Sequence, residues 1–234
     1  MNFASSSIAT PGITSRGQTV YLGSVFPLKA DATHPTYVYE RRVDGQGGER
    51  VSTHITRQPS GALALVESAT ESVDRGRVEY TLHRNQLGQS GTIRVEQGQV
   101  SFRLVDGSRV RSRTERQAGP VVVGPTLIGH ILGNIDRIRA GEVARVRLAV
   151  LDRLETIGFE LQSVKSEPGQ TRVRMKPTSL LLALVVDPIY FTFDTPTGKL
   201  VRLEGRVPPK IRAGDRWRDL DARVEYRFVA DRYL

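Results

Sequence analysis

From residue 37 onward, apolar and polar side chains alternate along most of the chain. In the stretch GRVEYTLHR, Val78, Tyr80 and Leu82 fall on one face, and the residues between them are charged or polar. The stretch QVSFRLV repeats the pattern. A period of two is typical of antiparallel strands that bury one face against a core. These segments are therefore predicted to be strands.

Turn residues interrupt the alternation at intervals of about ten residues, as they do between the strands of successive hairpins. Gly76, Gly88, Gly98 and Gly107 are four of these interruptions. The sequence predicts a mainly β fold, in which a meander of about 11–13 strands forms a strongly curved antiparallel sheet or barrel. A sheet with one apolar face must curl or be covered, so we expect a covering element.

One segment has helical periodicity. Pro125 suits a first helical turn, and Gly141 suits a helix stop. Between them, apolar residues recur at the spacing of one helix face: Leu127, Ile128, Ile131, Leu132, Ile135 and Ile138. The pattern predicts an amphipathic helix over Thr126 to Arg139 that caps the concave side or the mouth of the sheet.

A second apolar segment runs from Leu180 to Val186, between Pro177 and Pro188. A membrane-spanning helix needs about twenty apolar residues, so this run predicts no transmembrane segment. We expect a short buried helix of about two turns, with a fully buried strand as the alternative, because short apolar runs do not distinguish the two.

The chain is expected to form one domain, since all-β domains often reach a length of 234 residues. Residues 1–35 are rich in Ser, Thr, Gly and Pro, and are predicted to be an N-terminal arm or an edge strand, with strand pattern at Thr19 to Phe26. Residues 36–234 are predicted to form a single barrel-like domain. The start of the chain lacks the basic and apolar regions of a secretion signal.

The formal net charge of +9 would attract polyanions. However, arginine is spread over nearly every segment, and no compact basic run carries interleaved aromatic residues. The charge pattern therefore predicts no specific nucleic-acid partner. The chain has no cysteine, which excludes disulfides, thiolate metal sites and a cysteine nucleophile.

No catalytic motif stands out. The four histidines lack metal-ligand spacing, and His54 and His83 fall on polar strand faces, where we expect them to be exposed. The chain has neither a serine nucleophile elbow nor a glycine-rich phosphate loop. We predict no catalytic residues, no metal and no cofactor.

Several polar residues nevertheless bear on function. Glu67 and Glu160 lie in largely apolar strands, where burial would raise a carboxyl pKa into the range of acid-base chemistry. The equal alternative is that each carboxyl group points to solvent. Asp215, Asp219 and Asp221 lie among arginines and are expected to form surface ion pairs. Trp217, the single tryptophan, is expected to cover the end of the core.

The elements follow one another in a definite order: hairpins, then a helix begun by Gly-Pro, then a strand after Gly141 and Glu142, then the stretches at 153–159 and 187–205. In this order of elements the chain resembles an uncharacterised family of bacterial envelope proteins over residues 37–229. That family is similar in design to the half-barrels that carry lipoproteins and to lipocalin-like barrels. The resemblance implies an apolar-ligand binder of the periplasm or envelope and supplies no catalytic residues. The absence of a signal sequence leaves a cytoplasmic location open.

Three hypotheses follow. The first is a non-enzymatic binding module that holds a lipid or other apolar ligand inside the curved sheet. Its predicted wall residues are Leu65, Tyr80, Phe102, Phe159, Phe191 and Phe193. The second is a structural or assembly protein of the envelope with a filled barrel. The third is an isomerase- or cyclase-type enzyme inside a barrel, which requires Glu67 or Glu160 to point inward beside a void.

Overall fold

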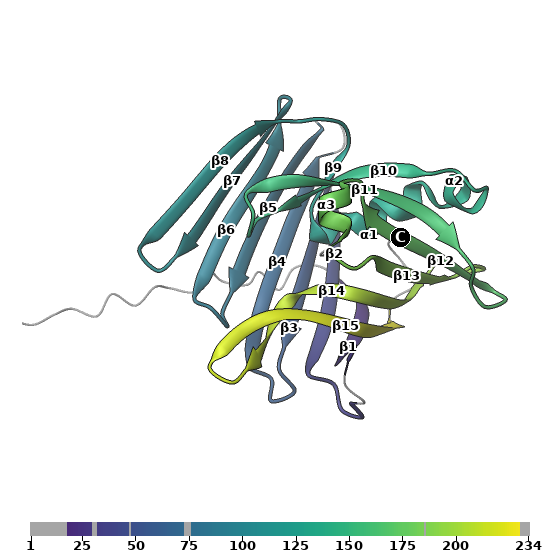
Figure 1. The fold of residues 1–234 in the computed structure, drawn as a ribbon, viewed down its shortest axis with the longest axis horizontal. Helices are drawn as coiled ribbons and strands as arrows, with labels where there is room; N and C mark the ends of the chain where they lie inside the picture. Colours follow the sequence, from purple (N-terminus) through teal and green to yellow (C-terminus); the bar gives the residue numbers. More distant parts are fainter. Residues whose placement is uncertain (1–17, 30–31, 47, 73–75, 185, 230–234) are drawn as a thin grey trace, which may run out of the picture.

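The computed structural model describes residues 18–29, 32–46, 48–72, 76–184 and 186–229, and shows one large curved sheet with three helices (Figure 1). The first eight strands are β1 (Gln18–Pro27), β2 (Tyr37–Gln46), β3 (Glu49–Arg57), β4 (Leu63–Ser72), β5 (Arg77–Arg84), β6 (Gln89–Glu96), β7 (Gln99–Asp106) and β8 (Arg109–Arg116). A second group comprises β9 (Val121–Val122), α1 (Gly124–Gly133), α2 (Ile135–Arg139), β10 (Ala144–Val150), β11 (Glu155–Val164) and β12 (Gln170–Pro177). The last elements are α3 (Leu180–Ala183), β13 (Ile189–Asp194), β14 (Leu200–Ala213) and β15 (Arg216–Phe228).

The fifteen strands form a single sheet in the order β8 to β1 followed by β15 down to β9. Two meanders therefore meet where β1 pairs with β15, and the sheet curls without closing (Figure 1). Every pairing is antiparallel except that of β9 with β10. The predicted mainly β, strongly curved antiparallel fold is confirmed. The strand number exceeds the expected 11–13 in part because β9 has two residues, too few to show an alternation.

The first strand differs from its predicted place. β1 pairs with β2 on one side and with β15 on the other, so it lies inside the sheet and is not an edge strand. Val20, Tyr21 and Val25 are almost fully buried. The predicted arm otherwise falls largely outside the described residues, which begin at residue 18. Residues 18–27 thus join the two meanders into one sheet.

The predicted alternation orients the strands as expected. On β5, Val78, Tyr80 and Leu82 are buried, whereas Thr81 between them is exposed. The inner face of β4 to β7 and the residues that pack on it form one apolar cluster, and strands β10 to β14 form another with α1. Burial of these faces is the main favourable contribution to folding.

The two clusters are packed against each other through the β10–β11 turn. Leu151 and Leu154 of this turn belong to the cluster of β4 to β7. Gly91 of β6 makes the approach possible, because a Cβ atom there would lie 2.6 Å from Leu151 Cδ2 and 2.7 Å from the backbone oxygen of Arg103. The sheet therefore curls until its second meander covers the first.

The predicted amphipathic helix is present as two segments. Asn134 ends α1 and begins α2, and its side-chain amide donates to the backbone oxygen of His130 at 2.9 Å. Ile131 and Ile138 are fully buried, so the apolar stripe continues across the break. Gly141 has a φ of 92°, which suits the predicted stop because glycine adopts positive φ without strain. The helix lies against β3 and β4 and caps the sheet, as expected.

The predicted short buried helix exists as α3, but it is not buried. Leu180, Leu181 and Leu184 are 79–85% exposed, and Leu182 is the leucine that packs partly against the core. The expectation was wrong because an apolar run is buried only where the fold provides a surface to cover it, and α3 contacts mainly β12. None of the helices in the described residues is long and apolar enough to cross a bilayer.

Candidate functional site

A cavity of about 160 Å³ lies on the inner face of the sheet, beside the start of α1. Its apolar wall comes from β1, β10, β13, β14, β15 and α1, and comprises Val25, Leu127, Ile128, Leu148, Ile189, Phe191, Leu200, Leu203, Val207 and Val224. Its remaining lining is polar, aromatic or glycine and proline: Tyr21, Tyr39, Arg41, His54, Thr56, Glu67, Gly124, Arg206, Pro208, Pro209 and Tyr226. The cavity is therefore amphipathic, with largely apolar walls and a few polar side chains.

A bulge in β14 forms one side of the cavity. Val207 pairs with Leu220 and Lys210 pairs with Asp219, so Pro208 and Pro209 have no counterparts on β15. Proline lacks the N–H group that a central strand needs, and is accommodated at bulges. Because Pro208 is exposed and lines the cavity, this is the side of the cavity nearest to solvent.

Three ionisable residues form a row across the inner face. Arg41 of β2 lies opposite His54 of β3, and His54 lies opposite Glu67 of β4. Directly opposite residues of antiparallel strands share a face, with Cβ atoms about 5 Å apart. All three line the cavity, and each is at most 8% exposed. We call Arg41, His54 and Glu67 the polar row.

Glu67 points inward, as the enzyme hypothesis required. Its Oε1 atom accepts a hydrogen bond of 2.8 Å from the hydroxyl of Tyr80. A Cβ atom on Gly124 would lie 3.2 Å from the same Oε1, so glycine at the start of α1 leaves room for the carboxyl group. Burial raises the pKa of Glu67, and the bond from Tyr80 opposes this in part. The protonated form is therefore favoured over a wider pH range than for an exposed glutamate.

His54 is buried, contrary to the expectation that it is exposed. The alternation placed it beside Ser52 and Thr56, but these two residues are themselves buried on the inner face. Its ring packs edge-on against Tyr39, with centroids 5.2 Å apart. Burial, with a smaller effect of Arg41, holds the pKa of His54 well below its ordinary value, so the imidazole is neutral. No described residue hydrogen-bonds to Nε2 of His54.

Arg41 is a buried cation among aromatic rings. Its Nε donates to Ser52 Oγ at 3.2 Å, and its guanidinium carbon lies 5.8 Å from the centre of the Tyr21 ring. Tyr226 lies edge-on to both Tyr21 and Tyr39. Burial raises the pKa of all three tyrosines, so their hydroxyls stay protonated. Among the described residues, Arg41 has no carboxylate within ion-pairing distance.

The six predicted wall residues are all buried but do not share one site. Leu65, Tyr80 and Phe102 belong to the cluster of the first meander, and Phe159, Phe191 and Phe193 to that of the second. Of these six, Phe191 lines the cavity. Tyr80 reaches the site through its hydrogen bond to Glu67. The role of the six in ligand binding stays a prediction.

Arg41 was not among the residues predicted from the sequence, although a signal was present. In YVYERRV, Arg41 stands two residues after Tyr39 and two before Val43, so the alternation places a charge on the apolar face. Such a buried charge indicates a functional or a paired group. This reasoning does not extend to His54, because its neighbours on the same face, Ser52 and Thr56, are polar and give no sign of the inward direction.

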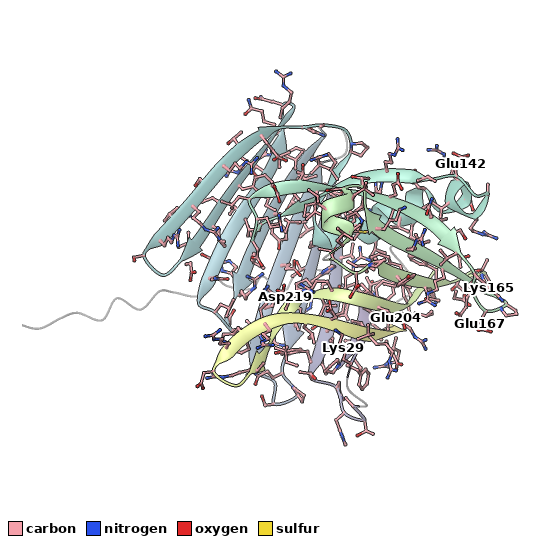
Figure 2. The ribbon with its side chains drawn as sticks, in the orientation of Figure 1. Lys29, Glu142, Lys165, Glu167, Glu204 and Asp219 are labelled. Carbon is pink, nitrogen blue, oxygen red and sulfur yellow. The ribbon has the colours of Figure 1, made fainter. Side chains whose placement is uncertain are left out.

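The other candidate residues named from the sequence do not line the cavity. Glu160 ion-pairs with Arg145 and Lys176, so it does not point inward. Asp219, labelled in Figure 2, lies by β14 and β15. It pairs with Arg206 and Lys210, as expected of a surface residue. Trp217 is partly exposed, beneath the guanidinium of Arg212. Within the described ranges, no group of three His, Asp or Glu side chains could hold a metal ion.

Comparisons with known proteins show no matching family model and no matching curated protein. Among solved structures, the chain is similar to a beta-barrel-like protein of a domain of unknown function, DUF1849, from Brucella abortus. The two share 10% sequence identity and a TM-score of 0.48 over 92% of this chain and 98% of the other.

Proposed function

We propose that the protein is a non-enzymatic binding module that holds a lipid or other apolar ligand inside its curved sheet. The observation that carries the proposal is the cavity between α1 and the inner face of the sheet, whose walls are mostly apolar. Ligand sites typically combine such walls with a few polar groups that fix orientation. The resemblance noted in the sequence supports a place for this module in the bacterial cell envelope.

The size of the cavity limits what it can hold. Its volume of about 160 Å³ is close to that of an engineered apolar cavity that binds benzene. It is smaller than the roughly 300 Å³ at which sites for drug-sized ligands begin. A ring or a short alkyl segment therefore fits inside, and a longer chain would extend toward the β14 bulge, on the side nearest to solvent.

The test uses native mass spectrometry of the gently purified protein, followed by titration of 1-octanol by calorimetry. We expect a co-purifying apolar molecule and saturable octanol binding. Val207→Phe would fill part of the cavity and should weaken octanol binding about tenfold or more, because the ligand then loses its space. Val110→Phe on β8, where Val110 is 51% exposed, is the matched control and should bind normally.

Absence of both a co-purifying molecule and octanol binding would favour the alternative of a structural or assembly protein with a filled interior. Normal octanol binding by Val207→Phe, in a variant that keeps its thermal unfolding transition, would show that octanol binds elsewhere.

A second candidate is an isomerase- or cyclase-type enzyme, because Glu67 meets the geometric condition that this hypothesis set. Its carboxyl group is buried beside the cavity and accepts a hydrogen bond from Tyr80. A carboxylic acid with a raised pKa can donate a proton to a bound substrate. Glu67→Gln should then abolish formation of a cellular product without loss of the fold, and an unchanged product profile would argue against an enzyme.

A further inference from the structure

The polar row contains binding capacity that the protein itself does not use. Arginine has five N–H donors, and the one Arg41 hydrogen bond found among the described residues uses Nε. The two terminal nitrogens, which could bind a carboxylate as a fork, have no acceptor in the part of the chain that the structure describes. Nε2 of the neighbouring His54 also has no hydrogen-bonding partner there.

These groups lie in a largely buried part of the protein, where water reaches them less than it would at the surface. Arg41 and His54 are each 8% exposed, and both line the cavity. A buried charge without a counter-ion is costly, and buried charges in proteins are usually paired. The edge-to-face rings and the contact of Arg41 with Tyr21 offset part of this cost. None of these ring contacts is a hydrogen bond to the guanidinium group, whose one hydrogen bond among the described residues is to Ser52.

We propose that the ligand of this cavity is an amphiphile with a carboxylate group, which pairs with Arg41 and accepts a hydrogen bond from His54 Nε2. The inference rests on the proposed function and adds the chemical class of the ligand. The apolar part of the ligand occupies the space between Leu203, Val224 and the first turn of α1. Ser52 holds Nε of Arg41, which leaves the terminal nitrogens for the ligand.

The donors favour a carboxylate over a phosphate. The polar row offers one guanidinium fork and one imidazole N–H, which match the two oxygen atoms of a carboxylate. A phosphate monoester has three terminal oxygens and close to two negative charges, and would need more donors or a second free cation. The other cation that lines the cavity, Arg206, is already ion-paired with Asp219 and Asp221. Glu67 completes the row. Since burial favours its protonated form, it adds less repulsion to an anionic ligand than an ionised glutamate would.

The test compares four ligands of equal chain length by calorimetry on the full chain at neutral pH: octanoate, 1-octanol, octyl sulfate and octyl phosphate. We expect octanoate to bind about tenfold or more tightly than 1-octanol, since a hydrogen-bonded charge is worth that much. Octyl sulfate and octyl phosphate should bind more weakly than octanoate. Tighter binding of either would overturn the choice of carboxylate.

Two variants test whether the preference for octanoate depends on the positive charge of Arg41 itself or on any nearby arginine. Arg41→Met removes the charge while keeping an extended side chain, and should abolish the preference for octanoate while 1-octanol binding stays within about threefold. Arg42→Met is the matched control, because Arg42 is adjacent in sequence and ion-pairs with Glu40 at 2.8 Å. It should keep the preference. If Arg41→Met does not fold, His54→Phe provides a second test, with an expected loss of octanoate affinity only.

The outcomes distinguish the two proposals. Octanol binding without a preference for octanoate, or a preference that survives both Arg41→Met and His54→Phe, would overturn the carboxylate and leave the apolar-ligand function standing. Failure of all four ligands to bind would overturn both.

Discussion

The side-chain amide of Gln86 pairs with the backbone of Lys210 in the way that a neighbouring strand would. Lys210 N donates to Gln86 Oε1 at 3.0 Å, and Gln86 Nε2 donates to the Lys210 oxygen at 2.9 Å. The Tyr37 hydroxyl, 2.7 Å from Gln86 Nε2, donates to the same oxygen. Residue 86 lies in the β5–β6 turn and residue 210 follows the β14 bulge. The Gln86 amide thus attaches the segment that follows the β14 bulge, on the side of the cavity nearest to solvent, to the first meander.

Gln86→Ala should lower the free energy of unfolding by about 2 kcal/mol, because it removes the acceptor of the partly buried Lys210 N–H at the bulge and one of the two donors to the Lys210 oxygen. Urea denaturation followed by circular dichroism measures this change. Gln99→Ala is the control, since Gln99 is exposed on β7. The control should change the free energy of unfolding by no more than about 0.5 kcal/mol. Equal effects of the two substitutions would mean that the amide does not hold the bulge.

The raised pKa of Glu67 makes the stability of the protein depend on pH. The folded state binds the Glu67 proton more tightly than the unfolded state, whose pKa is near the ordinary value of 4.5. This contribution is complete below that value and is lost as the pH rises through the folded pKa. Glu67→Gln should therefore be more stable than the parent protein at neutral pH, with the difference vanishing at acid pH.

Denaturation curves recorded at several pH values test the Glu67 prediction. Glu160→Gln is the matched change of a carboxylate to an amide outside the cavity, where Glu160 pairs with Arg145 and Lys176. A stability difference between Glu67→Gln and the parent that is constant with pH would contradict the argument.

His54 produces a dependence of the opposite sign. Because burial lowers its pKa, the unfolded state binds a proton more readily than the folded state as the pH falls below the ordinary value of 6.5. The contribution of His54 is present above that value and is lost toward acid pH. His54→Gln should lose less stability between neutral and mildly acid pH than the parent does. His83→Gln, at a partly exposed position on β5, should follow the parent.

The close contact of Gly91 predicts a steric effect. Gly91→Ala places a methyl group within 2.7 Å of a side-chain atom of Leu151 and of a backbone oxygen, so either the turn or the sheet must move. Overpacking of this kind costs about 1–3 kcal/mol. Gly133→Ala at the end of α1 is the control, because among the described residues no atom outside its own helix backbone and chain neighbours lies within 4 Å of the added methyl group. It should be neutral or slightly stabilising. Thermal unfolding distinguishes the two.

The sequence predicts the faces of the strands better than their order. Alternation is a local property, and Val78, Tyr80 and Leu82 point inward as it requires. The pairing of β1 with β15 joins residues about two hundred positions apart, for example Val25 with Val224. A single sequence carries no local signal for such a pairing, so β1 reads as an edge strand. Its central position follows from the pairing of the two meanders where β1 meets β15.

The candidate site was predictable in part. Glu67 was named as a candidate because it is an ionisable residue in an apolar strand. The side chain of such a residue can point into the core or out to solvent, and the sequence alone does not decide between the two directions. Glu160 has the same local pattern and took the other outcome, since Arg145 and Lys176 lie on its side of the sheet. The convergence of Arg41, His54 and Glu67 depends on the register of β2, β3 and β4. Register is set by the turns and by the whole inner face.

The exposed leucines of α3 provide the last prediction. Leu181 is 79% exposed, so Leu181→Ala removes almost no buried area. The substitution should change the free energy of unfolding by no more than about 0.5 kcal/mol. Leu161→Ala is the matched control, because Leu161 is fully buried on β11. The same substitution there should cost about 2–5 kcal/mol.

Urea denaturation at low protein concentration measures both leucine variants. A loss of about 2 kcal/mol or more for Leu181→Ala is the cost of truncating a buried leucine. Such a loss would mean that α3 is packed against a surface in solution, because truncation of an exposed side chain creates no cavity. That result would contradict the exposure of the α3 leucines seen in the structure.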